Sequence, residues 1–289
     1  MEISYEKQAE VLENLAEESV RRGDYETAAH LFRRLAVYYG LVGDKHGRRK
    51  FAIRAGEYYM RAAEALPDDI KVMALYLKAM ESFTEGGVRE AAHFCGLRIW
   101  ERFASIKDGV FEVDSEGIGV LRAVSDHFAE RGDLEKANIM YKSAAEMALK
   151  SGKLLLAGRL YKSAGDCNLR SGKIEEAADL YIKAANMYFS CEEYFEAAWS
   201  YCEAGFLLIC LRRFKEASDI SEMAEESCRR GQISIFLRDL SNLCNLLSRG
   251  LISEAREKWD KIRMKIRKEY AQIIESSFRS VEGDYNFPR

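Results

Sequence analysis

A repeat of 20 residues is the feature that most constrains how this chain of 289 residues can fold. Tyrosine recurs at this interval, with an alanine four residues before it and another alanine three residues after it. An internal repeat of this length predicts stacked helical units, each of which packs on its neighbours in sequence. The repeated positions are Ala137, Tyr141 and Ala144; Ala157, Tyr161 and Ala164; Ala177, Tyr181 and Ala184; and Ala197, Tyr201 and Ala204.

Turn residues separate the repeats. Positions three and four residues apart share one face of an α-helix, so each repeat predicts one helix followed by a tight turn. Glycine just past a helix end supplies a left-handed cap. Alanines let neighbouring backbones approach, and each tyrosine fills the space between helices, so we interpret the tyrosines as packing residues. The turns read Arg131-Gly132-Asp133, Ser151-Gly152-Lys153, Ser171-Gly172-Lys173 and, without glycine, Cys191-Glu192-Glu193.

The same pattern extends more loosely through the N-terminal half. The chain contains only two prolines, the residues that most strongly break helices. We therefore predict an all-α fold, an α-solenoid of antiparallel helix pairs. The expected helices are 2–21, 25–40, 46–65, 69–84, 88–106, 116–130, 134–150, 154–170, 174–190, 195–210, 214–229, 232–248 and 252–281.

A glycine-rich stretch interrupts the pattern. The segment "KDGVFEVDSEGIG", residues 107–119, holds three glycines and is expected to form a linker or kink. The predicted organisation is an N-terminal helical-repeat half, 1–106, then this connection, then regular repeats over 120–231. A C-terminal bundle, 232–289, contains one long closing helix, and all four parts are expected to form one continuous domain.

Composition narrows the function classes. The net charge of −3 provides no overall basic field that would attract nucleic acid. Seven cysteines without a CxxC pair favour reduced thiols, and no window of 18 consecutive apolar residues predicts a membrane span. The acidic, amphipathic start of the sequence is unlike a secretory signal. These features predict a cytoplasmic protein.

Motifs for catalysis or cofactor binding are weak. The four histidines are scattered, and His93 and Cys95, two positions apart, cannot share a helix face, whereas a metal site needs three or four converging ligands. The stretch "GIGVLRA" has Arg122 where a dinucleotide fingerprint needs its third glycine. We therefore predict no enzyme activity, metal, cofactor or small-molecule substrate.

Two basic stretches leave alternatives open. One carries Lys45, Arg48, Arg49, Lys50 and Arg54 with no acid between positions 45 and 54, and the other includes Lys261, Lys265 and Lys268. They form either solvated faces with ion pairs or a contact surface for an acidic helical partner. The first stretch follows an apolar tip containing Tyr39, Leu41 and Val42, a composition suited to weak peripheral membrane contact.

Two family resemblances follow from these residues. Gly132, Leu134, Ala137, Tyr141 and Ala144 match the second-helix pattern of tetratricopeptide repeats, although a helix pair here takes 40 residues and not about 34. The chain also resembles the soluble NSF attachment protein (SNAP) family. The resemblance rests on the longer helices and on two segments, "YYGLVGDKHGRRKFAIRAGEYYMRAAEAL" and the C-terminal "SEAREKWDKIRMKIRKEYAQIIESSFRSVEGDYNFPR".

The second resemblance implies a specific function. The fold would be a right-handed superhelix closed by a long C-terminal helix. Such a protein is a non-catalytic adaptor in vesicle trafficking that grips a SNARE helix bundle and recruits an AAA+ ATPase. The basic residues would face the bundle, and Glu282 and Asp284 would face the ATPase. The alternative is a generic tetratricopeptide-type scaffold for peptide binding or assembly, with no SNARE or trafficking role.

Overall fold

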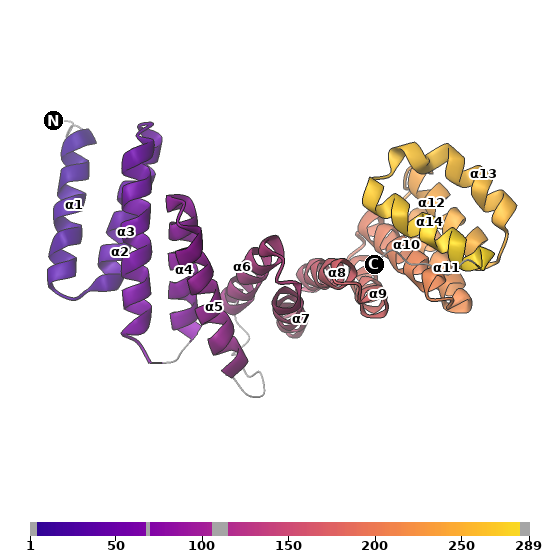
Figure 1. The fold of residues 1–289 in the computed structure, drawn as a ribbon, viewed down its shortest axis with the longest axis horizontal. Helices are drawn as coiled ribbons and strands as arrows, with labels where there is room; N and C mark the ends of the chain where they lie inside the picture. The colour runs from indigo at the N-terminus through magenta and orange to yellow at the C-terminus, as the bar shows by residue number, and fades with distance from the viewer. Residues whose placement is uncertain (1–4, 68–69, 106–114, 284–289) are drawn as a thin grey trace. The chain divides into compact units, whose positions relative to one another are not determined.

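A computed structural model describes residues 5–67, 70–105 and 115–283. Figure 1 shows helices joined by short turns, and no strand occurs within these ranges. The all-α prediction is confirmed. The elements are α1 (Tyr5–Arg21), α2 (Tyr25–Leu41), α3 (Lys45–Glu64), α4 (Ile70–Gly86), α5 (Arg89–Ser105), α6 (Ser115–Arg131), α7 (Leu134–Lys150), α8 (Leu154–Arg170), α9 (Ile174–Ser190), α10 (Tyr194–Cys210), α11 (Phe214–Arg230), α12 (Ile235–Ser248), α13 (Ile252–Ile262), the 3-10 turn η1 (Arg263–Lys265) and α14 (Lys268–Glu282).

The chain divides into two compact units, residues 1–130 (unit 1) and 131–289 (unit 2). Most of the expected connection at 107–119 lies outside the described residues, and the chain is helical from Ser115 onward. In the part of the chain that the structure describes, no helix is long and apolar enough to cross a membrane.

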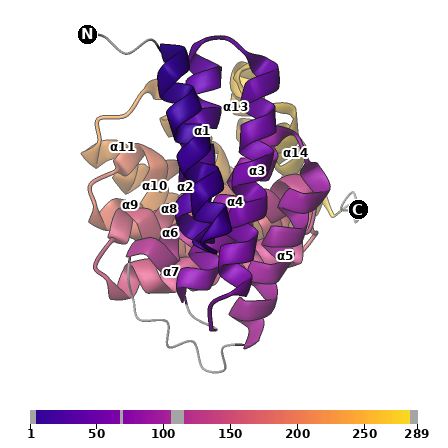
Figure 2. The same ribbon diagram turned by 90° about the vertical axis from the view of Figure 1, so that its left-hand side faces the viewer.

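Unit 1 is built from helices that pack on their sequence neighbours. α1 contacts α2, α2 contacts α3, and the series continues through α4 and α5. In the view of Figure 2, α1 lies in front of α2, with α3 next to them. Aromatic rings fill the interior, with Phe32 stacked on Phe51 at a centroid distance of 6.3 Å. Gly56 lies against the ring of Phe83, where a Cβ would come within 2.9 Å of ring carbons. The small residue therefore sets the close approach of α3 and α4.

Unit 2 contains the regular repeats. The helices predicted at 134–150, 154–170 and 174–190 are observed with those bounds as α7, α8 and α9. All eight repeated alanines have no exposed surface, and the four tyrosines are at most 6 % exposed. The repeat positions therefore lie in the interior of unit 2.

Two of the buried tyrosines also satisfy polar groups on the preceding helix. The hydroxyl of Tyr181 donates to Asp166 at 2.7 Å, and the hydroxyl of Tyr201 donates to Asn186 at 2.6 Å. In each case the acceptor lies 15 positions earlier, near the end of the helix before. Burial raises the pKa of Tyr201 to about 12, so the phenol stays a donor at neutral pH. Tyr181 and Tyr201 therefore each contribute packing and one directed hydrogen bond.

The C-terminal closing element differs from the prediction. The expected single helix over 252–281 is divided into α13 and α14, because Ile266 and Arg267 are extended at ψ values of 136° and 148°. A helix of that length would measure about 45 Å, against about 25 Å for the 17-residue helices beside it, so its apolar face would outrun the surface available to cover it. Like charges four residues apart, on Arg263 and Arg267, also disfavour a continuous helix there.

The division lets α14 fold back onto α10. The hydroxyl of Ser277 is 3.0 Å from the Phe206 carbonyl oxygen, and the hydroxyl of Ser280 is 3.3 Å from the Cys210 carbonyl oxygen. Phe278 is fully buried at this contact, and Ile274 nearly so. α10 consequently packs on α9, α11, α12 and α14 and forms the centre of unit 2.

Candidate functional site

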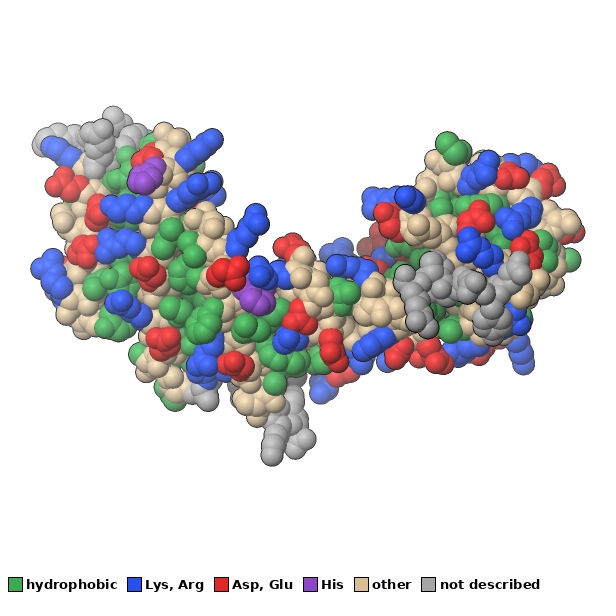
Figure 3. All heavy atoms as spheres, viewed as in Figure 1, with side chains coloured by type: hydrophobic (Ala, Val, Ile, Leu, Met, Phe, Trp, Pro, Cys, Tyr) green, Lys and Arg blue, Asp and Glu red, His purple; other side chains and the backbone are tan. Residues whose placement is uncertain are grey.

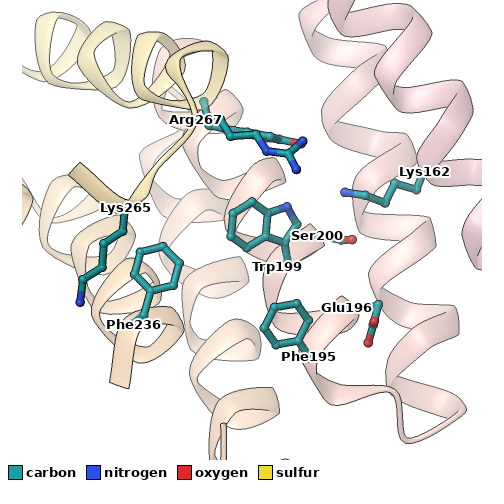
Figure 4. Close-up of a pocket in the computed structure, with 9 residues that line it drawn as sticks. Lys162, Phe195, Glu196, Trp199, Ser200, Phe236, Lys265 and Arg267 are labelled. Atoms are coloured by element: carbon teal, nitrogen blue, oxygen red, sulfur yellow. The ribbon is translucent and has the colours of Figure 1, made fainter. Parts of the chain in front are cut away.

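A cavity of about 470 Å³ opens in unit 2 beside α10 (Figure 4). Its walls come from α8, α10, α12, the α13–α14 connection and the first turn of α14. Four lining side chains are aromatic and three are basic. The lining residues are Lys162, Phe195, Glu196, Trp199, Ser200, Phe236, Lys265, Arg267 and Tyr270.

Helix geometry explains why these residues converge. Phe195 and Trp199 are four positions apart on α10, as are Glu196 and Ser200, so both pairs lie along the same side of the helix. Lys265 and Arg267 belong to the break between α13 and α14. The departure from a continuous closing helix therefore supplies part of the cavity wall.

A buried carboxylate fixes three of the lining residues. Glu203, on α10, accepts hydrogen bonds from Trp199 Nε1 at 2.7 Å, from Lys162 Nζ and from the hydroxyl of Tyr270. Its side chain is 4 % exposed. Burial, the largest influence, raises the pKa of Glu203, while Lys162 and Tyr270 act in the opposite direction. Glu203 thus ties α8, α10 and α14 together beneath the cavity.

Ser200 contributes an unsatisfied polar atom to the wall. The residue is fully buried, and its Oγ has no hydrogen-bond partner among the described residues. Buried polar groups in folded proteins are nearly always hydrogen-bonded. A polar ligand group that reaches this hydroxyl would satisfy it.

Positive charge predominates around the cavity. Lys265 and Arg267 are exposed, and neither forms an ion pair with another described residue. Lys162 is paired with Glu203, and the acid in the cavity wall is Glu196. Figure 4 shows Arg267 and Lys162 extending from opposite sides toward the middle of the cavity.

The basic stretch predicted on α3 is largely neutralised within unit 1. Arg48 pairs with Glu85 at 2.8 Å, Lys50 with Glu13 at 3.7 Å, and Arg54 with Glu17 at 2.6 Å. The acids come from α1 and α4, far in sequence from residues 45–54. Lys45 and Arg49 are exposed and have no ion pair with a described residue. Figure 3 shows basic and acidic side chains interspersed on the visible face of unit 1.

The predicted apolar tip lies at the end of α2. Leu41 is 83 % exposed and Val42 is 54 % exposed, whereas the ring of Tyr39 stacks on Phe51 at a centroid distance of 5.1 Å. Leu41 and Val42 therefore project into solvent, and Tyr39 belongs partly to the interior.

The C-terminal candidates are dispersed. Lys261 pairs with Glu257 at 2.7 Å, and Glu282 accepts from Arg256 at 2.9 Å. Lys268 is exposed, Asp284 lies outside the described residues, and Lys265 lines the cavity.

Sequence reasoning missed most of the cavity, although the repeat contains a signal for it. Trp199 stands at the position held by Ile139, Arg159 and Asp179 in the earlier copies, and Phe195 follows Glu135, Leu155 and Glu175 in the same way. At these two positions the other copies carry charged or aliphatic residues. Large aromatic residues there indicate that this part of the helix surface has a different function. Phe236 and Tyr270 lie outside the repeat and carry no such signal.

Within the described residues, no group of three or more histidine, cysteine, aspartate or glutamate side chains is arranged to hold a metal ion. Two of the scattered histidines do meet in unit 1, with His93 Nδ1 3.4 Å from His127 Nε2. Their rings contact each other within the helix packing, and the ring of Phe128 lies against that of His93.

Comparison with solved structures identifies the class of fold. A crystal structure of a signal transduction ATPase with numerous domains, with a tetratricopeptide repeat sensor, from Pyrococcus horikoshii is similar over 96 % of this chain, with a TM-score of 0.52 and 17 % identity. BtubC from P. vanneervenii covers 83 % of this chain and 93 % of its own (TM-score 0.47, 15 % identity). Aspartyl phosphate phosphatase F from Bacillus subtilis covers 92 % and 73 % (TM-score 0.43, 12 % identity).

The first of these similarities supports a tetratricopeptide-like helical-repeat fold. This chain spans 44 % of the length of that ATPase, and at 17 % identity the likeness concerns the fold alone. No model of a known protein family matches the chain, and no curated protein sequence is significantly similar to it. Membership in the soluble NSF attachment protein family stays a prediction.

Proposed function

We propose that this chain is a non-catalytic protein-interaction scaffold that binds a segment of a partner protein in the cavity of unit 2. The observation that carries the proposal is the convergence of four aromatic side chains on one open cavity. Phe195 is 51 % exposed there, so its ring is accessible to a ligand in the cavity. Aromatic residues around a few fixed polar groups are typical of binding sites.

The polar groups favour binding over catalysis. Glu203 is committed to three donors, and Lys162 is committed to Glu203, so neither is a free base or nucleophile. Their arrangement instead holds Trp199 and Tyr270 in fixed orientations, with ring centroids 5.4 Å apart. A preorganised aromatic wall lowers the entropy cost of capturing a flexible segment.

A displayed library of random 12-residue peptides, selected against the full-length protein, tests the proposal. We expect selected peptides to lose about tenfold in affinity on Phe195→Ala, since exposed aromatic anchors dominate such interfaces. Phe94→Ala is the matched control, because Phe94 is a 47 % exposed phenylalanine in unit 1. Failure to select any peptide, or peptides that respond equally to both changes, would contradict the proposal.

A SNAP-type adaptor role is the second candidate. The exposed Leu41 and Val42, followed by Lys45, favour a weak contact with an anionic membrane. Flotation with vesicles that contain phosphatidylserine should decrease on Leu41→Asp but not on Val37→Asp, a change at a 51 % exposed position on the same helix. Mixing with a hexameric AAA+ ATPase and a SNARE bundle should raise ATP hydrolysis. No flotation and no stimulation would remove this candidate.

A further inference from the structure

We infer that the segment bound in the unit 2 cavity is acidic, with an apolar side chain held among the aromatic residues and an adjacent carboxylate bound by Arg267 and Lys162. This inference rests on the proposed function and specifies its ligand. It concerns the chemistry that the cavity recognises, a carboxylate next to an apolar side chain.

The apolar part of the ligand follows from the wall. Figure 4 shows Phe195, Trp199 and Phe236 around one side of the cavity, and Tyr270 completes the lining. Phe195 comes from α10 and Phe236 from α12, so an inserted side chain would contact two helices at once. A segment composed only of charged residues would leave these rings in water and gain nothing from them.

The acidic part follows from the charge balance. Three basic side chains line the cavity, Lys162, Lys265 and Arg267, against the two acids at or beneath its wall, Glu196 and Glu203. Glu203 compensates the charge of Lys162 through one hydrogen bond, which leaves the Lys162 ammonium two further N–H donors. Lys265 and Arg267 provide the uncompensated charge. A guanidinium binds a carboxylate through two parallel hydrogen bonds, which gives direction as well as attraction.

Ser200 supplies the third contact for the carboxylate. In Figure 4 its hydroxyl lies on the side of the cavity toward which Lys162 extends. This Oγ is buried and has no hydrogen-bond partner among the described residues. A ligand carboxylate between Arg267 and Lys162 would give that hydroxyl an acceptor and remove an unsatisfied polar group.

Fluorescence anisotropy with labelled peptides on the full-length protein tests the inference. The first probe has the core Glu-Phe-Asp-Leu-Glu and an amidated end. A second has Gln-Phe-Asn-Leu-Gln and an amidated end, and a third has this neutral core with a free terminal carboxylate. A fourth, Glu-Ala-Asp-Ala-Glu, removes the apolar side chains. The second and third probes separate side-chain carboxylates from a chain end as the source of the charge.

We expect the first probe to bind about tenfold more tightly than the second and the fourth, with an affinity that falls as salt increases. Arg267→Glu should weaken binding of the first probe about tenfold, and Ser200→Ala a few-fold. Lys268→Glu is the matched control, since it makes the same charge change one residue further on without touching the cavity. Arg267→Gln, with thermal melting to verify folding, separates loss of contact from charge reversal.

Three outcomes of these binding measurements would overturn the inference. Equal binding of the first two probes, with sensitivity to Phe195→Ala retained, would overturn the inference and leave the proposed function standing. Equal effects of Arg267→Glu and Lys268→Glu would also overturn it, because attraction would then be non-specific. Tight binding of nucleoside phosphates in place of any probe would overturn both proposals.

Discussion

At the residue scale, the turns of unit 2 share one backbone conformation, a residue with positive φ. Gly132, Gly152 and Gly172 have positive φ values, and the same place is taken by Glu192, Arg212 and Gln232 in the next three turns, with φ of 61°, 59° and 48°. The left-handed conformation therefore recurs every 20 residues, whether or not glycine is present. A residue with a Cβ is strained there, so the geometry of the repeat overrides the preference of the residue.

Replacing Glu192 by glycine should relieve this strain. We expect Glu192→Gly to stabilise the protein by about 0.5 to 1 kcal/mol, because glycine adopts a positive φ without a steric penalty but costs some backbone entropy. Chemical denaturation measures the free energy of unfolding. Glu193→Gly is the control, since Glu193 has φ of −81° and should gain nothing. Equal effects of the two changes would show that the turn is not strained.

Gly165 tests the close packing of the tyrosine ladder. A Cβ at this position would lie 2.8 Å from Tyr181 Cε1. We expect Gly165→Ala to destabilise the protein by about 1 to 3 kcal/mol through overpacking.

Gly119 is the matched position, since it lies in helix α6 and a Cβ there meets nothing within 4 Å. Gly119→Ala should stabilise by up to about 1 kcal/mol through helix propensity. Thermal melting of both variants measures these effects on stability. An unchanged melting temperature for Gly165→Ala would contradict the overpacking explanation.

The break in the closing helix is the main feature at the scale of elements. Arg267 has φ of −63°, which proline also adopts, and Ile266 before it is extended, as a residue before proline prefers to be. At this turn the backbone N–H of Ile266 donates to the Arg263 carbonyl oxygen, and that of Ala271 donates to the Arg267 carbonyl oxygen. The connection is therefore preorganised for a proline at position 267.

Arg267→Pro should consequently change the free energy of unfolding by less than about 1 kcal/mol. The same substitution in the interior of α13, Glu257→Pro, should cost about 3 kcal/mol or more because it removes a helical hydrogen bond and clashes with the preceding turn. Denaturation of the two variants distinguishes the alternatives. A large loss of stability in Arg267→Pro would indicate that the helix continues through this point.

Stability is distributed unevenly at the scale of the whole molecule. Twelve of the 17 residues of α10 are buried, and it packs on four other helices of unit 2. In α13 three of 11 residues are buried. We expect the amides of α10 to exchange with solvent most slowly and those of α13 much faster, since local opening exposes little apolar surface there. Hydrogen exchange followed by mass spectrometry measures this order, and equal protection of both helices would contradict it.

Much of the fold could be read from local spacing. The 3-4 spacing of Ala137, Tyr141 and Ala144 and the turn glycines are properties of neighbours in sequence, and they determined helix bounds that the structure reproduces from α7 to α9. The closing helix could not be read in this way. An amphipathic pattern indicates which face is apolar but contains no information on how much surface exists to cover it.

The candidate site also divides into features that the sequence predicts and features that depend on the tertiary structure. The ladder tyrosines were identifiable as packing residues because their role follows from periodicity. The sequence by itself thus determined an all-α chain of tightly turned, stacked helices. Only the tertiary structure decided that Lys162, Trp199, Phe236 and Arg267 meet at one cavity, and that Arg48 and Arg54 are neutralised by acids from other helices. The physical reason is that convergence and charge compensation depend on distances between helices, which residues far apart in sequence set together.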